Sequence, residues 1–140
     1  MKKIIALILA MGMVLLAGCS SGKQVDNTFK DKTDPIVENL LQSIKNSDYK
    51  SFNTDLDDKM KSAFTEATFT KMENLLKDKI GTYQSKEYWK VEQSGEYKIV
   101  YYKAKYEKEK DYVVVKVVTS ETGGKIYVSG LYFDSPNLRK

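Results

Sequence analysis

The spacing of apolar residues changes once along this chain, at Gly81, and that change constrains the fold more than any other feature. Before Gly81, apolar side chains recur every three or four residues, which is the period of an amphipathic helix. After Gly81, apolar and polar residues alternate, and tyrosine and valine become frequent, as in half-buried strands. The sequence therefore predicts helices first and a sheet afterwards, in one α+β domain.

Two helices carry the clearest signals. Asp34-Pro35 is a favourable helix start, because aspartate caps well and the first turn does not need the N–H that proline lacks. A later helix begins after Thr65, whose hydroxyl can cap it, and ends at Gly81. Shorter helical turns are expected between them. The apolar residues predicted to face the core from the two helices are Ile36, Val37, Leu40, Leu41, Ile44, Phe69, Met72, Leu75, Leu76 and Ile80.

Four strands are predicted after Gly81, and the connections between them are short enough for antiparallel hairpins. The third strand is apolar on both faces apart from Lys116, which is typical of a central strand. Gly130, inside the last strand, indicates a bulge or a bend. Together with the helices, this pattern predicts a curved, cone-like four-stranded antiparallel meander with the helices packed on one face. The predicted strands run over residues 83–92, 97–107, 112–119 and 125–133.

The first 18 residues have the layout of a secretion signal. Lys2 and Lys3 precede an uncharged apolar run over 4–17, which is shorter than the roughly 20 residues that span a bilayer. Leu16-Ala17-Gly18-Cys19 resembles the lipobox of bacterial lipoproteins. The resemblance implies cleavage before Cys19 and attachment of diacylglyceryl to its sulfur, which would hold the protein on the extracytoplasmic face of the cell membrane. Two acyl chains give stable anchoring, at roughly 0.8 kcal/mol per buried CH₂.

These signals divide the chain into a signal peptide (1–18), a lipidated cysteine with a polar tether (19–33) and a single α+β domain (34–140). Cys19 is the only cysteine, so no disulfide can form within the chain. The net charge of +4 falls to about +2 once the signal peptide is removed. This weak excess argues against nucleic acid as a partner, because nucleic-acid binding normally requires a clustered basic footprint.

Three stretches of the predicted domain resemble the domain of unknown function 3887 family, within the nuclear transport factor 2-like and cystatin-like cone folds. They are Asp48-Tyr49-Lys50-Ser51-Phe52, Lys79-Ile80-Gly81-Thr82-Tyr83 and Ile126-Tyr127-Val128-Ser129-Gly130-Leu131-Tyr132-Phe133. The resemblance implies a helical layer over a cone-shaped sheet, with a pocket between them or a homodimer across the sheet. It implies no catalytic residue, because the family has no agreed activity.

The residue types available exclude several kinds of chemistry. The chain has no histidine, which removes Ser-His and Cys-His nucleophilic sites as well as zinc sites built on histidine. Asp55, Asp57 and Asp58 fail the EF-hand spacing and are better explained as favourable charges at a helix start. Ser47-Asp48-Tyr49-Lys50 matches a Ser-x-x-Lys pattern, but its partner motifs are missing. The sequence therefore predicts no cofactor, no metal and no catalytic residue.

Nine of the ten tyrosines lie in the strand region, beside the single tryptophan, Trp89. They either fill the core as cross-strand pairs or line a site for an apolar or sugar ligand. Trp89, Tyr102 and Tyr106 are the candidate ligand-binding residues. Lysines also recur on the first hairpin, where they form either a solvated face or a basic stripe able to meet anionic lipid or wall polymer. These lysines are Lys86, Lys90, Lys98, Lys103 and Lys105.

Two function hypotheses follow. The first is a membrane-anchored, non-enzymatic module that binds a small ligand or an envelope protein. The alternative is a small pocket enzyme of ketosteroid isomerase-like type, by analogy of fold. That alternative requires a buried carboxylate with a perturbed pKa beside Tyr102 or Tyr106. The carboxylates that the strands bring near are Glu87, Glu92, Glu96 and Glu107.

Overall fold

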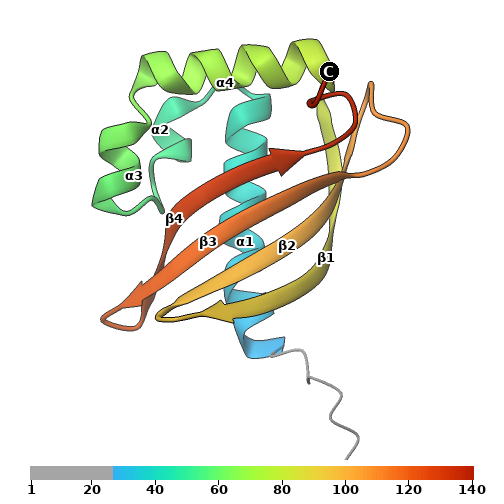
Figure 1. Ribbon diagram of the computed structural model, residues 1–140. Helices are drawn as coiled ribbons and strands as arrows, with labels where there is room; N and C mark the ends of the chain where they lie inside the picture. The colour runs from blue at the N-terminus through green and yellow to red at the C-terminus, as the bar shows by residue number, and fades with distance from the viewer. Residues whose placement is uncertain (1–26) are drawn as a thin grey trace, which may run out of the picture.

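The computed structural model describes residues 27–140, so the predicted signal peptide, Cys19 and the first part of the predicted tether lie outside the described residues. Over these residues the chain forms four helices followed by four strands (Figure 1). The helices are α1 (Asn27–Lys45), α2 (Tyr49–Phe52), α3 (Asp58–Ala63) and α4 (Glu66–Lys79). The strands are β1 (Tyr83–Ser94), β2 (Tyr97–Tyr106), β3 (Val113–Thr122) and β4 (Lys125–Asp134). The predicted α+β class, with helices first and a meander afterwards, is confirmed.

The sheet has the order β1-β2-β3-β4, and each neighbouring pair is antiparallel. β3 therefore lies between β2 and β4, as its apolar faces predict. A register irregularity falls between Val118 and Thr119, opposite Gly130. A Cβ atom on Gly130 would come within 3.1 Å of the Val118 side chain, which explains why glycine occupies the bend.

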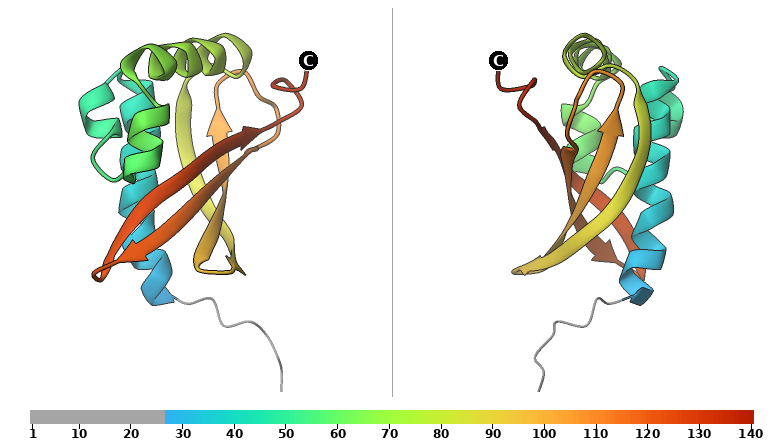
Figure 2. Two further views of the ribbon diagram at one scale, coloured as in Figure 1. Left: turned by 60° about the vertical axis from the view of Figure 1, so that its left-hand side comes forward. Right: turned by 90° about the vertical axis from the view of Figure 1, so that its right-hand side faces the viewer.

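The two faces of the sheet have different surroundings. α1 runs along one face, which we call the inner face, while no helix among the described residues covers the other, the outer face (Figure 2). α4 crosses one end of the sheet, and the β1–β2 and β3–β4 hairpins lie at the opposite end, together with the N-terminus of α1 (Figure 1). The domain is thus a twisted sheet with one open face and two distinct ends.

The core lies between the inner face and the helices. Alternate residues of β2 point into it, as the period of two predicts, and Tyr102 is fully buried there. From the helices, the Phe52 and Phe69 rings meet at a centroid distance of 4.8 Å. One helix prediction is wrong: Leu75 is 52% exposed, because Phe69 and Leu76 occupy the face of α4 that turns toward the core. The other large buried apolar residues are Val37, Leu40, Leu41, Leu56, Ile80, Val100, Val113, Val115 and Val117.

The boundary predicted at Asp34 is also wrong, because α1 begins at Asn27 and Pro35 lies inside it. Phe29 is only 6% exposed, and the Lys98 ammonium of β2 lies 4.4 Å from its ring centroid. The buried Thr33 hydroxyl donates a hydrogen bond to the Phe29 carbonyl at 2.9 Å. These contacts outweigh the backbone hydrogen bond that proline removes from a helix interior. Residues 27–33 therefore belong to the domain and not to the tether.

The other local signals are realised as predicted. Thr65 caps α4 by accepting a hydrogen bond from the Thr68 N–H at 3.3 Å. Asp57 caps α3 by accepting one from the Met60 N–H at 2.8 Å, so part of the acidic cluster serves as a helix start. Gly81 has a φ of 80° and donates its N–H to the Leu76 carbonyl, which ends α4 in the left-handed conformation that glycine tolerates.

Candidate functional site

Two of the three predicted ligand-binding residues, Tyr102 and Tyr106, lie in the core on the inner face of β2. The Tyr102 hydroxyl donates a hydrogen bond to Asp34 Oδ1 of α1 at 2.7 Å. The Tyr106 ring packs on Tyr83 at a centroid distance of 5.7 Å, and its buried hydroxyl finds no hydrogen-bond partner among residues 27–140. Both side chains support the fold. Tyr102 is fully buried, whereas Tyr106 borders a hollow of about 410 Å³ beside Tyr112.

Asp34 belongs to a polar cluster that joins α1 to the first two strands. Lys30 lies 2.5 Å from its Oδ2 atom, and Lys86 of β1 lies 3.5 Å from its Oδ1 atom. Lys86 also lies 3.5 Å from Glu38 Oε2, which accepts a hydrogen bond from the Tyr83 hydroxyl at 3.0 Å. Only 11% of the Lys86 side chain is exposed, so its charge depends on these two carboxylates. The cluster fastens α1 to the sheet.

The electrostatics of this cluster bear on the enzyme alternative. Burial raises the pKa of Asp34, but the hydrogen bonds from Lys30 and Tyr102 and the charge of Lys86 outweigh burial and bring the pKa below its ordinary value of 3.8. Burial and the hydrogen bond to Asp34 together raise the pKa of Tyr102. A carboxylate does lie beside Tyr102, but it is ionised and ion-paired at neutral pH. A general base works best when its pKa is close to the operating pH. The lowered pKa of Asp34 and its contacts with Lys30, Lys86 and Tyr102 are those of a charge cluster that holds α1 on the sheet.

Trp89, the third predicted residue, lies on the outer face, so the structure does not bring it together with Tyr102 and Tyr106. It is 43% exposed and falls at a register irregularity of β1 between Tyr88 and Lys90. Its ring meets Tyr101 of β2 edge-on, at a centroid distance of 6.2 Å. The accessible aromatic surface of this domain is therefore on the outer face.

Lysine ammonium groups lie between these rings and join them into a continuous row. Lys90 Nζ is 5.1 Å from the Trp89 centroid and 4.5 Å from that of Tyr101. Lys103 Nζ is 4.8 Å from the centroids of both Trp89 and Tyr112. We call these five side chains, in the order Tyr101, Lys90, Trp89, Lys103 and Tyr112, the aromatic–lysine row.

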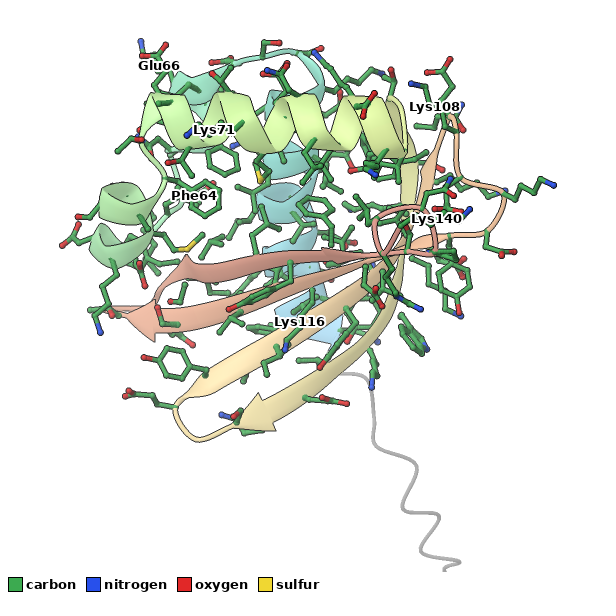
Figure 3. All side chains as sticks on the ribbon, turned by 45° about the horizontal axis from the view of Figure 1, so that its top comes forward. Phe64, Glu66, Lys71, Lys108, Lys116 and Lys140 are labelled. Carbon is green, nitrogen blue, oxygen red and sulfur yellow. The ribbon has the colours of Figure 1, made fainter. Side chains whose placement is uncertain are left out.

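The same pairing occurs on the other half of the outer face. Lys116 lies on β3 (Figure 3). Its Nζ atom is 5.2 Å from the ring centroid of Tyr132, which lies on β4 and is 57% exposed. Lys90 forms an ion pair with Glu92 at 2.5 Å. Lys103, Lys105 and Lys116 form no salt bridge with any residue in the described part of the chain. The outer face thus combines exposed rings with positive charge that is not neutralised within the domain.

The carboxylates expected from the strands lie elsewhere. Glu92 accepts a hydrogen bond from the Tyr101 hydroxyl at 2.9 Å on the outer face, and Glu87 is exposed opposite Lys103. Glu96 lies in the β1–β2 turn, and Glu107 directly follows β2. Asp34 and Glu38 of α1 were missed, because the sequence assigned Asp34 to a helix cap. Their signal is the spacing of four residues that places Lys30, Asp34 and Glu38 along one side of a helix.

A second polar cluster joins the end of α1 to α4. Ser47 has a φ of 58°, and its hydroxyl donates a hydrogen bond to the nearly buried Glu73 carboxylate. Lys77 also binds Glu73, and its Nζ atom lies 3.3 Å from Ser47 Oγ. Burial raises the pKa of Glu73, but the hydrogen bonds from Lys77 and Ser47 bring it below its ordinary value. This cluster holds the αL residue that ends α1, and the lysine of the Ser-x-x-Lys pattern, Lys50, takes no part in these hydrogen bonds.

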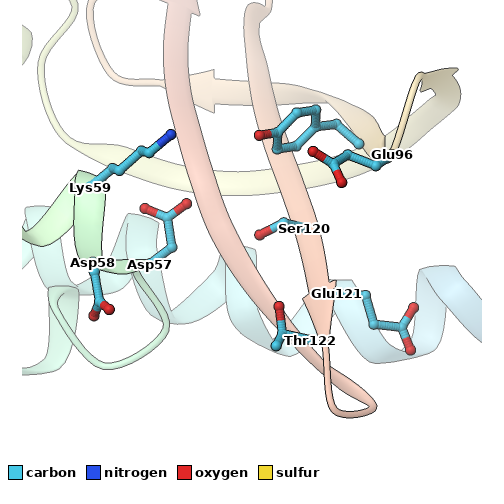
Figure 4. Close-up of a pocket in the computed structure, with 8 residues that line it drawn as sticks. Asp57, Asp58, Lys59, Glu96, Ser120, Glu121 and Thr122 are labelled. Carbon is cyan, nitrogen blue, oxygen red and sulfur yellow. The ribbon is translucent and has the colours of Figure 1, made fainter.

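A polar hollow of about 360 Å³ opens at the hairpin end of the domain (Figure 4). It is lined by Asp57, Asp58, Lys59, Glu96, Tyr97, Ser120, Glu121 and Thr122. Ligand pockets of this size usually have an apolar lining, which this hollow lacks. Within residues 27–140, no group of three acidic, histidine or cysteine side chains is placed to hold a metal ion. None of the helices formed by these residues is long and apolar enough to cross a membrane.

The fold and the open sheet define a class of small α+β domains with helices before a β-meander. The chain belongs to the family described as Protein of unknown function (DUF3887), whose sequence model matches residues 37–119, from α1 into β3. This confirms the family resemblance noted in the sequence.

Among the solved structures that are similar to this chain is that of Bdellovibrio bacteriovorus Bd1075. The two chains are 19% identical with a TM-score of 0.50, and the match covers 79% of this chain and 42% of Bd1075. This chain therefore spans less than half the length of that protein, and the likeness concerns the fold alone. No curated protein matches the chain.

Proposed function

We propose that this protein is a lipid-anchored extracytoplasmic binding module, which uses the outer face of its sheet to hold a ligand or partner and performs no catalysis. The observation that carries the proposal is the outer face itself. It exposes Trp89, Tyr112 and Tyr132 beside lysines whose charge the domain does not neutralise. Large aromatic side chains with an apolar body and a polar tip are typical of contact surfaces.

The anchor is supported by the Leu16-Ala17-Gly18-Cys19 motif. Since α1 already includes Asn27, at most residues 20–26 would separate the lipidated cysteine from the domain. Seven residues span at most roughly 23–25 Å, at 3.3–3.6 Å per residue. Because the N-terminus of α1 lies beside the two hairpins, this link would keep the hairpin end toward the membrane. The outer face would then stand at the side of the domain, where a ligand can reach it.

The absence of catalysis in the proposal is supported by the state of the Asp34–Tyr102 pair. A ketosteroid isomerase-like enzyme needs a carboxylate that exchanges a proton with its substrate in an enclosed pocket. Asp34 is instead committed to Lys30, Lys86 and Tyr102, and these contacts hold its pKa low. No observation in the described residues favours the enzyme over the binding module.

The anchor is tested by intact-mass analysis of the full-length chain expressed in a bacterium that processes lipoproteins. The expected product begins at Cys19 and carries the mass of diacylglyceryl, and the Cys19→Ala variant lacks that mass. A chain that keeps residues 1–18, or begins at Cys19 without lipid, would contradict the anchor.

The binding role is tested by native mass spectrometry of the processed chain mixed with an envelope extract. A bound species of defined mass is expected, and it should be lost from the Trp89→Ala variant but retained by Leu75→Ala, which removes an exposed apolar residue from α4. Equal loss from both variants, or no bound species with either, would contradict a binding role for the outer face.

A further inference from the structure

We infer that the ligand of the outer face is an anionic saccharide chain, that is, a sugar polymer carrying phosphate, sulfate or carboxylate groups. This inference rests on the proposed function and adds the chemical class of the ligand. It follows from three properties of the outer face: the arrangement of its rings, the sign of its charge and its lack of an enclosed pocket.

The arrangement of the rings favours an extended ligand. Four ring–ammonium contacts of 4.5–5.1 Å link the aromatic–lysine row from Tyr101 to Tyr112, and the Lys116–Tyr132 pair lies on the neighbouring strands β3 and β4. A compact ligand would meet one of these rings, whereas a chain can meet several in succession. The rings are already held by lysines, so little ordering is needed when a ligand binds.

The sign of the charge selects an anion. Lys103, Lys105 and Lys116 form no salt bridge within the described residues, while the acidic groups of the same face are engaged: Glu92 binds Lys90 and Tyr101, and Asp134 binds Arg139. The exceptions are Glu87, which lies opposite Lys103, and the carboxylates of Glu107 and Asp111, which border one hollow together with Lys105 and Tyr112. The charge argument therefore rests on Lys103 and Lys116 more than on Lys105. A second copy of this chain is a poor occupant, because a symmetric dimer across the face would bring the same lysines together.

The shape of the face favours a saccharide over a small apolar molecule. The polar hollow lies at the hairpin end of the sheet, and the hollow bordered by Tyr106 and Tyr112 lies at the other end, so neither encloses the aromatic–lysine row. A ligand must therefore bind to an open surface by stacking. Sugar rings stack their C–H faces on aromatic rings, and their hydroxyl and anionic groups can accept hydrogen bonds from lysine ammonium groups and tyrosine hydroxyls. Single-stranded nucleic acid also stacks on rings, but the small net charge of the chain argues against it.

The experiment uses the full chain, as the host processes it, held in nanodiscs of neutral phosphatidylcholine. Because Trp89 is the only tryptophan, its fluorescence reports directly on the aromatic–lysine row. Four probes of matched length are titrated: dextran sulfate, uncharged dextran, polyglutamate and single-stranded oligothymidylate. Dextran sulfate is expected to change the Trp89 emission at the lowest concentration, and added salt is expected to weaken its binding because the contacts are exposed.

Matched variants separate the outer face from general charge attraction. The double variant Lys103→Gln/Lys116→Gln is expected to raise the dissociation constant for dextran sulfate by about three- to tenfold. Tyr132→Leu should weaken binding as well, because it removes one ring. Lys71→Gln, which removes a charge from α4, should leave the dissociation constant unchanged, since Lys71 is remote from the outer face (Figure 3).

Other outcomes overturn the inference in distinguishable ways. Equal binding of polyglutamate would mean an acidic protein segment, and tighter binding of oligothymidylate would mean a nucleic acid. Both results would leave the proposed binding module intact. Binding of dextran sulfate that Lys71→Gln weakens as much as the double variant would mean attraction to the whole chain. No response to any probe would also overturn the inference, while the native mass spectrometry described above decides the proposed function separately.

Discussion

Replacing Phe29 with alanine tests whether residues 27–33 belong to the domain, as the structure shows, or whether the domain begins at Asp34, as the sequence predicts. Phe29 is buried in the first turn of α1 and stacks beneath the Lys98 ammonium at 4.4 Å. If residues 27–33 were a tether, the substitution would change nothing. If they belong to the domain, it removes a buried ring from the packing between α1 and the hairpin end of the sheet.

The expected loss follows from two contributions. Burying a phenylalanine side chain stabilises a fold by about 1.5–3 kcal/mol. The contact with Lys98, which is shielded on one side, adds about 0.5–1 kcal/mol. We therefore expect Phe29→Ala to lower the free energy of unfolding by about 2–4 kcal/mol. The value should lie toward the lower part of the usual range for core phenylalanines, because the first turn of a helix can relax into the space that the ring leaves.

The measurement is urea unfolding of the full processed chain, followed by circular dichroism at the helix band. Lys32→Ala is the matched control, because Lys32 lies in the same turn but is exposed. Its effect should stay within about 0.5 kcal/mol. If Phe29→Ala were no more costly than Lys32→Ala, the first turn of α1 would not be part of the folded domain and the boundary predicted at Asp34 would stand.

Three further predictions concern stability; the first and third use the same urea unfolding assay, and the second uses thermal melts. Tyr106→Phe should leave the free energy of unfolding unchanged or slightly higher, because the buried hydroxyl that it removes has no hydrogen-bond partner among the described residues. Tyr102→Phe should lower the free energy of unfolding by about 1–2 kcal/mol, because it removes a hydrogen bond to an ionised carboxylate. Equal effects of the two substitutions would contradict these roles of the hydroxyl groups. The pKa of Asp34 is lower in the folded chain than its ordinary value of 3.8, so its stabilising contribution is present above that pH and is lost as the pH falls through the folded value. Thermal melts between pH 2 and 7 should therefore show a shallower acid decline for Asp34→Asn than for the unmodified chain, and parallel curves would refute the assignment. Gly81→Ala should lower the free energy of unfolding clearly more than Gly95→Ala. Both glycines have a positive φ, which costs alanine about 1–2 kcal/mol, but of the two only Gly81 would bring the added Cβ to 3.0 Å from neighbouring atoms. Similar losses of stability would mean that the β2–β3 connection moves to accommodate the added methyl group.

The sheet was predictable because its signals are local. Alternation of apolar and polar residues fixes which side of each strand is buried, so the inner face of β2, with Tyr102 and Tyr106, follows from the sequence. The polar connections and their glycines mark the turns. The central place of β3 was predicted from the apolar residues on both of its faces, although no helix among the described residues covers its outer face.

The start of α1 and the side of the sheet on which Trp89 lies were not predictable, for two separate reasons. Asp34-Pro35 carries a strong local signal for a helix start, but the burial of Phe29 against the sheet is a tertiary contact that no local pattern shows. In β1, the irregularity between Tyr88 and Lys90 interrupts the alternation, so the side of the sheet on which Trp89 lies cannot be counted from either end. The sequence therefore grouped Trp89 with Tyr102, whereas the two lie on opposite faces.

The early start of α1 also constrains how the proposed module would stand on a membrane. With the anchor at Cys19, the hairpin end would lie within roughly 25 Å of the lipid surface, given the seven-residue link. That end carries Asp57, Glu96 and Glu121 around its polar hollow. Lys59, Lys98 and Lys125 lie at the same end, so the short link, and not charge repulsion from headgroups, would set the orientation of the domain. The lysines of the outer face would then remain free for a ligand from the cell envelope, because the membrane to which the chain is attached would not occupy them.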